Sequence, residues 1–171
     1  YGQSLADALA VWHEKAGGKA SIDYGFHIIV RDMNDAVEAE LGRLPQEGIT
    51  SFKLFMAYKG MLGVDDLVLV RALEQARRSG ALVMVHAENT DAIAYLSERL
   101  LAAGKSAPRY HGQSRPSPVE REATHRAITL AELLTSIEAL GARVGREAAA
   151  RERVQAIRSA WERTAAASRG L

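Results

Sequence analysis

No cysteine occurs among the 171 residues, so disulfide bonds and thiolate metal sites are excluded, and a reducing cytoplasm is the compartment we expect. Neither sign of charge dominates, because the chain has 22 basic and 21 acidic residues and a formal net charge of +1. This balance favours neither nucleic acid nor an anionic membrane as a partner. The apolar runs also fall far short of the roughly 20 residues that a membrane-spanning helix needs.

The first residues of the chain contain no Met, no basic segment and no apolar segment that would make a signal peptide. A chain that opens in this way is expected to be cut from a longer one. Its length nevertheless suffices for one domain with a hydrophobic core.

Helical and strand-like segments alternate along most of the chain. Apolar and β-branched residues predict strands over residues 20–31, 49–57 and 81–86, and a polar loop is expected over residues 105–115. The order α-β-α-β-α-β-α-α predicts right-handed βαβ units and a parallel sheet. Helical spacing and capping residues predict five helices. The first covers residues 4–16, and the second begins at a cap, Asp32 or Asn34, and ends before Pro45. The others run from Asp65 to Gly80, from Asn89 or Thr90 to Gly104, and from Ser117 to Leu134.

Lys53 lies within an apolar segment, Phe52 to Met56, that is typical of a strand buried on both faces. A buried ammonium without a partner is costly, so this side chain must change its charge state or find a partner. Carboxylation by carbon dioxide is one solution, because the neutral amine then becomes a carbamate whose oxygens can bridge two metal ions. The alternative is a lysine on an edge strand whose ammonium reaches water.

His86 ends the third predicted strand, one strand–helix–strand step after Lys53. Parallel sheets bind ligands at the carboxyl ends of their strands, so the two side chains are expected at the same end of neighbouring strands. His86 is either a metal ligand or a hydrogen-bonded core histidine. Tyr58 follows the second strand, and its hydroxyl is either an oxyanion donor or a solvated packing group. Glu88 and Asn89 are expected to cap the following helix.

The remaining histidines lack the spacing of metal ligands. His27 alternates with its strand neighbours and is predicted to be structural. His13, His111 and His125 lie on predicted helix or loop positions and are expected to be solvated or to act as caps.

Four strings stand out: DYGFH (residues 23–27), GITSFKLFMAYKG (48–60), GALVMVHAEN (80–89) and SRPSPVEREA (114–123). In sequence and order they resemble the dihydropyrimidinase and hydantoinase family of the amidohydrolase superfamily, and the resemblance covers about residues 1–134. It implies an α/β fold, with about three βα units of a (β/α)8 TIM barrel. We therefore expect a partial amidohydrolase barrel over residues 1–134 and a divergent Ala- and Arg-rich tail, helical or disordered, over residues 135–171.

The resemblance also implies a function. The family hydrolyses the ring amide of 5,6-dihydropyrimidines or hydantoins to N-carbamoyl amino acids at a binuclear zinc site. Lys53 matches the carboxylated lysine that bridges the two zinc ions, His86 matches a ligand of one zinc, and Tyr58 matches the catalytic tyrosine that holds the substrate and stabilises the oxyanion. A small cyclic amide is the implied partner, and the complete protein is expected to form a homotetramer.

The chain departs from the family pattern in three places. The His-x-His pair of the family lies upstream of this sequence, no histidine follows His125 where another zinc ligand is expected, and the downstream aspartate has no counterpart. We therefore expect an incomplete site that binds metal poorly and a chain that is inactive alone. A (β/α)8 barrel takes about 250 residues, so three strands should form an open arc with uncovered apolar surface, and marginal stability or association should follow.

Two other functions remain open. One is a non-catalytic interaction protein of the same fold, similar to the dihydropyrimidinase-related proteins that have lost the metal ligands. The other is an allantoinase or dihydroorotase, which use similar metal chemistry. Retention of Lys53, Tyr58 and His86 favours enzymatic ancestry, and the string MAYK (residues 56–59) favours the hydantoinase branch.

Overall fold

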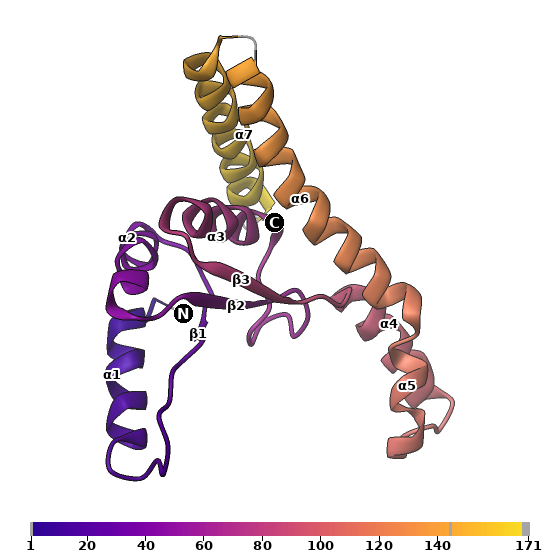
Figure 1. Cartoon of the computed structure of the whole chain (residues 1–171). Coiled ribbons are helices and arrows are strands. Elements are labelled where there is room, and N and C mark those ends of the chain that lie inside the picture. The colour runs from indigo at the N-terminus through magenta and orange to yellow at the C-terminus, as the bar shows by residue number, and fades with distance from the viewer. Residues whose placement is uncertain (1, 144, 169–171) are drawn as a thin grey trace. The chain divides into compact units, whose positions relative to one another are not determined.

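The computed structural model describes residues 2–143 and 145–168. The chain forms two compact units, over residues 1–125 and 126–171. The first is an α/β structure in which helices alternate with three strands, as predicted (Figure 1). Its elements are α1 (Leu5–Ala16), β1 (Ile28–Ile29), α2 (Asp35–Arg43), the 3-10 helix η1 (Leu44–Glu47), β2 (Ser51–Phe55), α3 (Asp66–Ser79), β3 (Leu82–His86), α4 (Thr90–Ala102), the 3-10 helix η2 (Pro108–Tyr110), α5 (His111–Ser114) and the beginning of α6 (Ser117–Arg143).

Four helices begin at side chains that the sequence marks as caps. Ser4, Asn34, Asp65 and Asn89 each accept a hydrogen bond from the backbone N–H three residues further on, at the starts of α1, α2, α3 and α4. Each bond satisfies one of the N–H groups that the first turn of a helix leaves without a partner. The predicted starts of these helices are confirmed.

The three strands form one parallel sheet in the order β1-β2-β3, which confirms the predicted sheet type. The predicted strand over residues 20–31 is wrong in length, because only Ile28 and Ile29 pair with β2. Ile22 is 83% exposed. The β-branched residues of this segment favour extended backbone, but a strand exists only where a neighbour supplies hydrogen bonds.

One face of the sheet packs against helices. Side chains alternate between the two faces of a strand, and those of Val30, Phe52 and Leu54 point to the face where each is 0% exposed. Helix α3 packs on β2 and β3, and α2 packs beside α3 (Figure 1). The helices bury Val37 and Leu41 from α2 and Leu69, Val70, Ala72 and Ala76 from α3.

The opposite face carries His27 and Ile29 on or beside β1, Lys53 and Phe55 on β2, and Leu82, Met84 and His86 on β3. This face is more open, because Ile29 is 43% and Leu82 63% exposed. The expected uncovered apolar surface is therefore present on this face. Marginal stability and association of the chain stay predictions.

The second unit contains the rest of α6 and α7 (Glu147–Ser168). The described part of the predicted tail is helical, apart from a short connection between these helices, and Ala150 and Val154 are buried. The predicted boundary after residue 134 falls within α6 and stays a prediction. The polar loop predicted over residues 105–115 contains η2 and α5 instead. No helix in the described part of the chain is long and apolar enough to cross a bilayer.

Candidate functional site

A tight turn after β2 holds Tyr58 in an unusual conformation. Its φ of 63° lies in the left-handed region, which costs a non-glycine residue about 1–2 kcal/mol. The carbonyl oxygen of Tyr58 accepts hydrogen bonds from the N–H groups of Met61, Leu62 and Gly63, at 3.0, 3.1 and 3.0 Å. Gly63 closes the turn so tightly that a Cβ there would lie 2.7 Å from the carbonyl oxygen of Ala57. Backbone strain of this kind gathers at functional sites.

The three predicted site residues gather around the ring of Phe55. In the parallel register Lys53 lies beside Met84, and Phe55 lies beside His86, so Lys53 and His86 are diagonal neighbours on one face. The Nζ atom of Lys53 is 5.0 Å from the Phe55 ring centroid, and the ring of His86 is 5.5 Å from it. The Tyr58 ring lies 5.9 Å from that of Phe55 and 5.5 Å from that of His86. His86 and Tyr58 therefore lie at and just after the carboxyl ends of β3 and β2, and Lys53, from the middle of β2, brings its Nζ atom to the same Phe55 ring.

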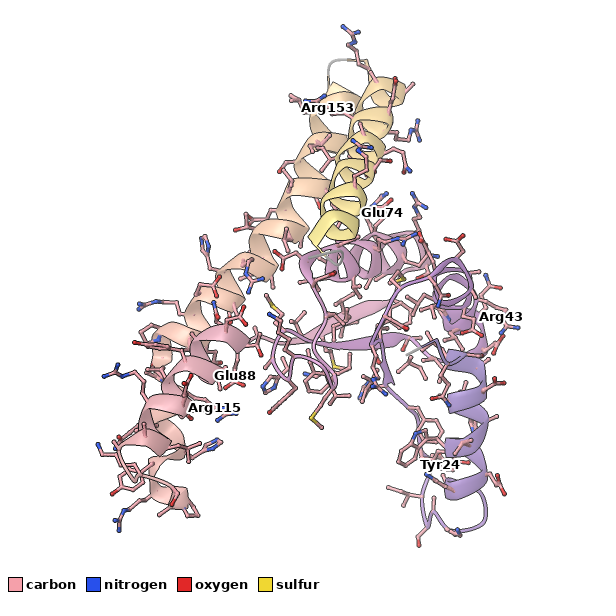
Figure 2. All side chains as sticks on the ribbon, turned by 180° about the vertical axis from the view of Figure 1, so that it is seen from behind. Tyr24, Arg43, Glu74, Glu88, Arg115 and Arg153 are labelled. Atoms are coloured by element: carbon pink, nitrogen blue, oxygen red, sulfur yellow. The ribbon has the colours of Figure 1, made fainter. Side chains whose placement is uncertain are left out.

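His86 has a partner that the sequence did not predict. Its Nε2 atom lies 2.8 Å from Oε2 of Glu88, whose Oε1 atom lies 3.4 Å from Nε of Arg115. Glu88 and Arg115 lie together in Figure 2. The predicted capping role belongs to Asn89 alone, because Glu88 turns to His86 instead. The His-x-Glu spacing after a strand permits this pair but does not distinguish it from a Glu88 that caps the next helix.

Polar contacts connect the residue before α4 to the start of α6, and the loop after β2 to the start of α4. The N–H of Asn89 donates to the carbonyl oxygen of Val119 at 3.1 Å, and its Nδ2 donates to Oε2 of Glu122 at 2.7 Å. Lys59 forms an ion pair with Asp91 at 3.1 Å, with both side chains more than 70% exposed. Exposed contacts contribute little stability, and the Asn89–Glu122 hydrogen bond is exposed like the Lys59–Asp91 pair.

The other histidines lie elsewhere. The Nδ1 atom of His27 is hydrogen-bonded to Oγ of Ser51 at 2.5 Å, at the amino end of β2. His13 on α1 is exposed, as predicted for a solvated group, and its ring meets that of Phe26 edge-on at 4.9 Å. His111 lies 3.4 Å from Arg115 through its Nδ1 atom.

Zinc is the metal that the resemblance implies, and the donors at this site fit it in type. An imidazole nitrogen is a common zinc ligand, and a carboxylated Lys53 would supply carbamate oxygens. The second ring nitrogen of a ligating histidine usually meets a carboxylate, as His86 meets Glu88. The donors fall short in number, because the described residues contain no group of three His, Cys, Asp or Glu side chains that could hold a metal ion.

Comparison with known proteins identifies relatives of this chain by sequence. The D-hydantoinases of Ralstonia pickettii and Rhizobium radiobacter are each 56% identical over 135 residues, which is 79% of this chain and 30% of the relative. The dihydropyrimidinase of Rattus norvegicus is 43% identical over 131 residues. The chain therefore spans about 30% of the length of the D-hydantoinases it matches. No protein-family model matches the chain.

Solved structures of similarly named proteins resemble the fold of this chain. The dihydropyrimidinase from Brevibacillus agri superposes with a TM-score of 0.74 at 54% identity, over 77% of this chain and 29% of that one. A D-hydantoinase structure gives a TM-score of 0.75 at 57% identity and the same coverage. The predicted fold class, α/β with part of a TIM barrel, is confirmed. Over about 77% of its length, the chain is thus homologous to one segment of the D-hydantoinase and dihydropyrimidinase family.

Proposed function

We propose that this chain is a segment of a zinc-dependent hydrolase that opens the ring amide of hydantoins or 5,6-dihydropyrimidines to N-carbamoyl amino acids. One observation carries the proposal: Lys53, Tyr58 and His86 gather around the ring of Phe55, which lies at the carboxyl end of β2 beside His86 of β3. A parallel sheet binds ligands at this end. Relatives that are named D-hydantoinase and dihydropyrimidinase give the substrate class.

Each side chain has a role in this proposal. Lys53, carboxylated on Nζ, and His86 would hold zinc, which when bound polarises the ring carbonyl and lowers the pKa of water. The Tyr58 hydroxyl would donate a hydrogen bond to the oxygen on which negative charge develops. The turn that holds the Tyr58 carbonyl with three hydrogen bonds supports this role, because an oxyanion donor must be placed before the reaction begins.

The chain alone would hold only part of this site. Two protein donors are fewer than the three that a catalytic zinc ion takes from a protein, and a binuclear site needs more. We therefore infer that the 171-residue chain binds zinc weakly and does not hydrolyse hydantoin by itself. Residues 1–134 would be the barrel part, and a cytoplasmic homotetramer would be the state of the complete protein.

A chimera tests whether this segment carries competent ligands. Residues 1–134 would replace the matching segment of the Ralstonia pickettii D-hydantoinase, which supplies the rest of the barrel. We expect the chimera to contain zinc and to hydrolyse hydantoin. Lys53→Ala and His86→Ala should abolish both zinc binding and turnover. Tyr58→Phe, which retains the ring contacts, should retain zinc and lose turnover by a factor of roughly 100 or more, as for other oxyanion donors.

Met84→Leu is the matched control for Lys53, since Met84 is its neighbour in the register and a volume-conserving change is well tolerated. It should leave zinc content unchanged. A folded chimera without zinc and without turnover would contradict the proposal and favour the non-catalytic interaction protein. Stoichiometric zinc and turnover in the isolated 171-residue chain would contradict the inference that its site is incomplete.

A further inference from the structure

Strand β1 forms one edge of the sheet in the described part of the chain. The N–H of Val30, just after β1, donates to the carbonyl oxygen of Lys53 at 2.9 Å, toward β2. Successive residues of a strand direct their backbone groups to alternate sides. The N–H and C=O of Ile29 therefore point away from β2, to the outer edge. Such an edge is a template for pairing with another strand.

A cavity of about 440 Å³ lies between this edge and helix α1. One wall is a stripe of α1 at helical spacing, and the other is the segment over residues 26–32. The stripe contains Leu5, Ala8, Leu9 and Trp12. Leu5 and Leu9 are each 8% exposed, whereas Trp12 is 55% exposed, so the stripe is covered at one end only. One water occupies about 30 Å³, so the cavity has room for several side chains.

The direction of α1 indicates how a strand would lie in this cavity. The N–H of Gly2 donates to Oδ2 of Asp32 at 2.6 Å, just after β1, and the ring of His13 meets that of Phe26 at 4.9 Å, just before β1. Helix α1 thus runs beside β1 in the opposite direction (Figure 1). A strand parallel to β1 would end beside Gly2, with α1 placed over it as the helix is in a βαβ unit.

We propose that this cavity binds an extended polypeptide segment, which adds to β1 as a parallel strand and places apolar side chains under α1. Main-chain hydrogen bonds to Ile29 hold the segment, and the cavity selects apolar residues at alternate positions. A small molecule would fill the cavity but leave the backbone groups of the edge unpaired. The chain spans about 30% of the D-hydantoinases it matches, so most of the polypeptide of such a protein lies outside it and is available to supply the segment.

Disulfide trapping tests the proposal, because the chain has no cysteine of its own. Gln3→Cys places a thiol at the end of the cavity where β1 finishes, and Gly25→Cys places one before β1, where a Cβ meets nothing within 4 Å. The probe is a synthetic peptide of about eight alternating valine and threonine residues, long enough for the wall over residues 26–32. It carries a cysteine at its carboxyl or its amino terminus.

The two peptides should show opposite preferences. In a glutathione buffer, we expect the peptide with a carboxyl-terminal cysteine to form at least about tenfold more disulfide with Gln3→Cys than with Gly25→Cys, equivalent to about 1.4 kcal/mol. The peptide with an amino-terminal cysteine should prefer Gly25→Cys. Because the preference reverses, a difference in reactivity between the two protein thiols cannot produce it.

Variants and a control peptide separate strand addition from adhesion to an apolar surface. Ala8→Trp, added to Gln3→Cys, fills the cavity and should reduce trapping about tenfold, or about 1.4 kcal/mol. Ala10→Trp, at an exposed position of α1 outside the cavity lining, is the matched control and should leave trapping unchanged. A peptide with proline in place of threonine lacks the N–H groups of a strand and should not be trapped. Circular dichroism verifies that each variant is folded.

Several results would overturn the proposal: equal trapping at both positions, the opposite orientation, equal trapping of the proline peptide, or trapping that persists in folded Ala8→Trp. A dimer of the unmodified chain that excludes the peptide would also overturn it, because a second copy would then be the occupant. Should Ala8→Trp fail to fold, the orientation preference and the proline peptide still decide. The assay contains neither zinc nor hydantoin, so its failure and that of the chimera are distinguishable.

Discussion

The two faces of the sheet should respond differently to the same substitution. Leu54 on β2 points to the face that α3 covers and is 0% exposed, whereas Leu82 on β3 lies on the opposite face and is 63% exposed. Leucine to alanine removes three carbons, each worth about 0.8 kcal/mol when buried, and a core site adds a cavity term. We therefore expect Leu54→Ala to lower the free energy of unfolding by about 3–4 kcal/mol and Leu82→Ala by about 1 kcal/mol.

Urea unfolding followed by circular dichroism measures both variants against the parent chain. With a slope of about 1–3 kcal/mol per molar urea, the two midpoints should differ by about 1 M or more. Equal losses for the two variants would refute the assignment of an open face, because Leu82 would then be covered in solution. Repeating the Leu82→Ala comparison at two protein concentrations would show whether a second copy provides that cover.

Three further substitutions test the loops around the site. Gly63→Ala should destabilise the chain by about 1–3 kcal/mol in the same assay, because the new Cβ would meet the carbonyl oxygen of Ala57 at 2.7 Å. Asn89→Ala should cost about 1 kcal/mol in urea unfolding, since it removes the cap of α4. Lys59→Ala should lower the free energy of unfolding by less than about 1 kcal/mol, because its pair with Asp91 is exposed.

Controls make these outcomes specific. Gly112→Ala should be harmless, because a Cβ at Gly112 meets nothing within 4 Å, and Asn89→Asp should retain most of the capping energy. A stable Gly63→Ala would mean that the turn after β2 is looser than described. A costly Lys59→Ala would mean that this pair is more shielded from water than its exposure indicates.

Much of the site was predictable because it depends on short segments. The strand around Lys53, the step from it to His86 and the place of Tyr58 after the strand all follow from apolar pattern and spacing. The partner of His86 was not predictable, because no residue near Glu88 in the sequence distinguishes a glutamate that caps a helix from one that turns back to the His86 ring. That choice depends on Arg115, which approaches from a segment beyond α4.

Local chemistry specified the helix starts and the alternation of helices and strands that predicts a parallel sheet, because a cap or an apolar pattern is decided by residues only a few positions apart. The folded arrangement alone limited β1 to Ile28 and Ile29, left one face of the sheet open and joined Arg115 to His86 through Glu88. These features need partners that are distant in the sequence. A strand ends where its neighbour's hydrogen bonds end, and a side chain is buried only if another element covers it.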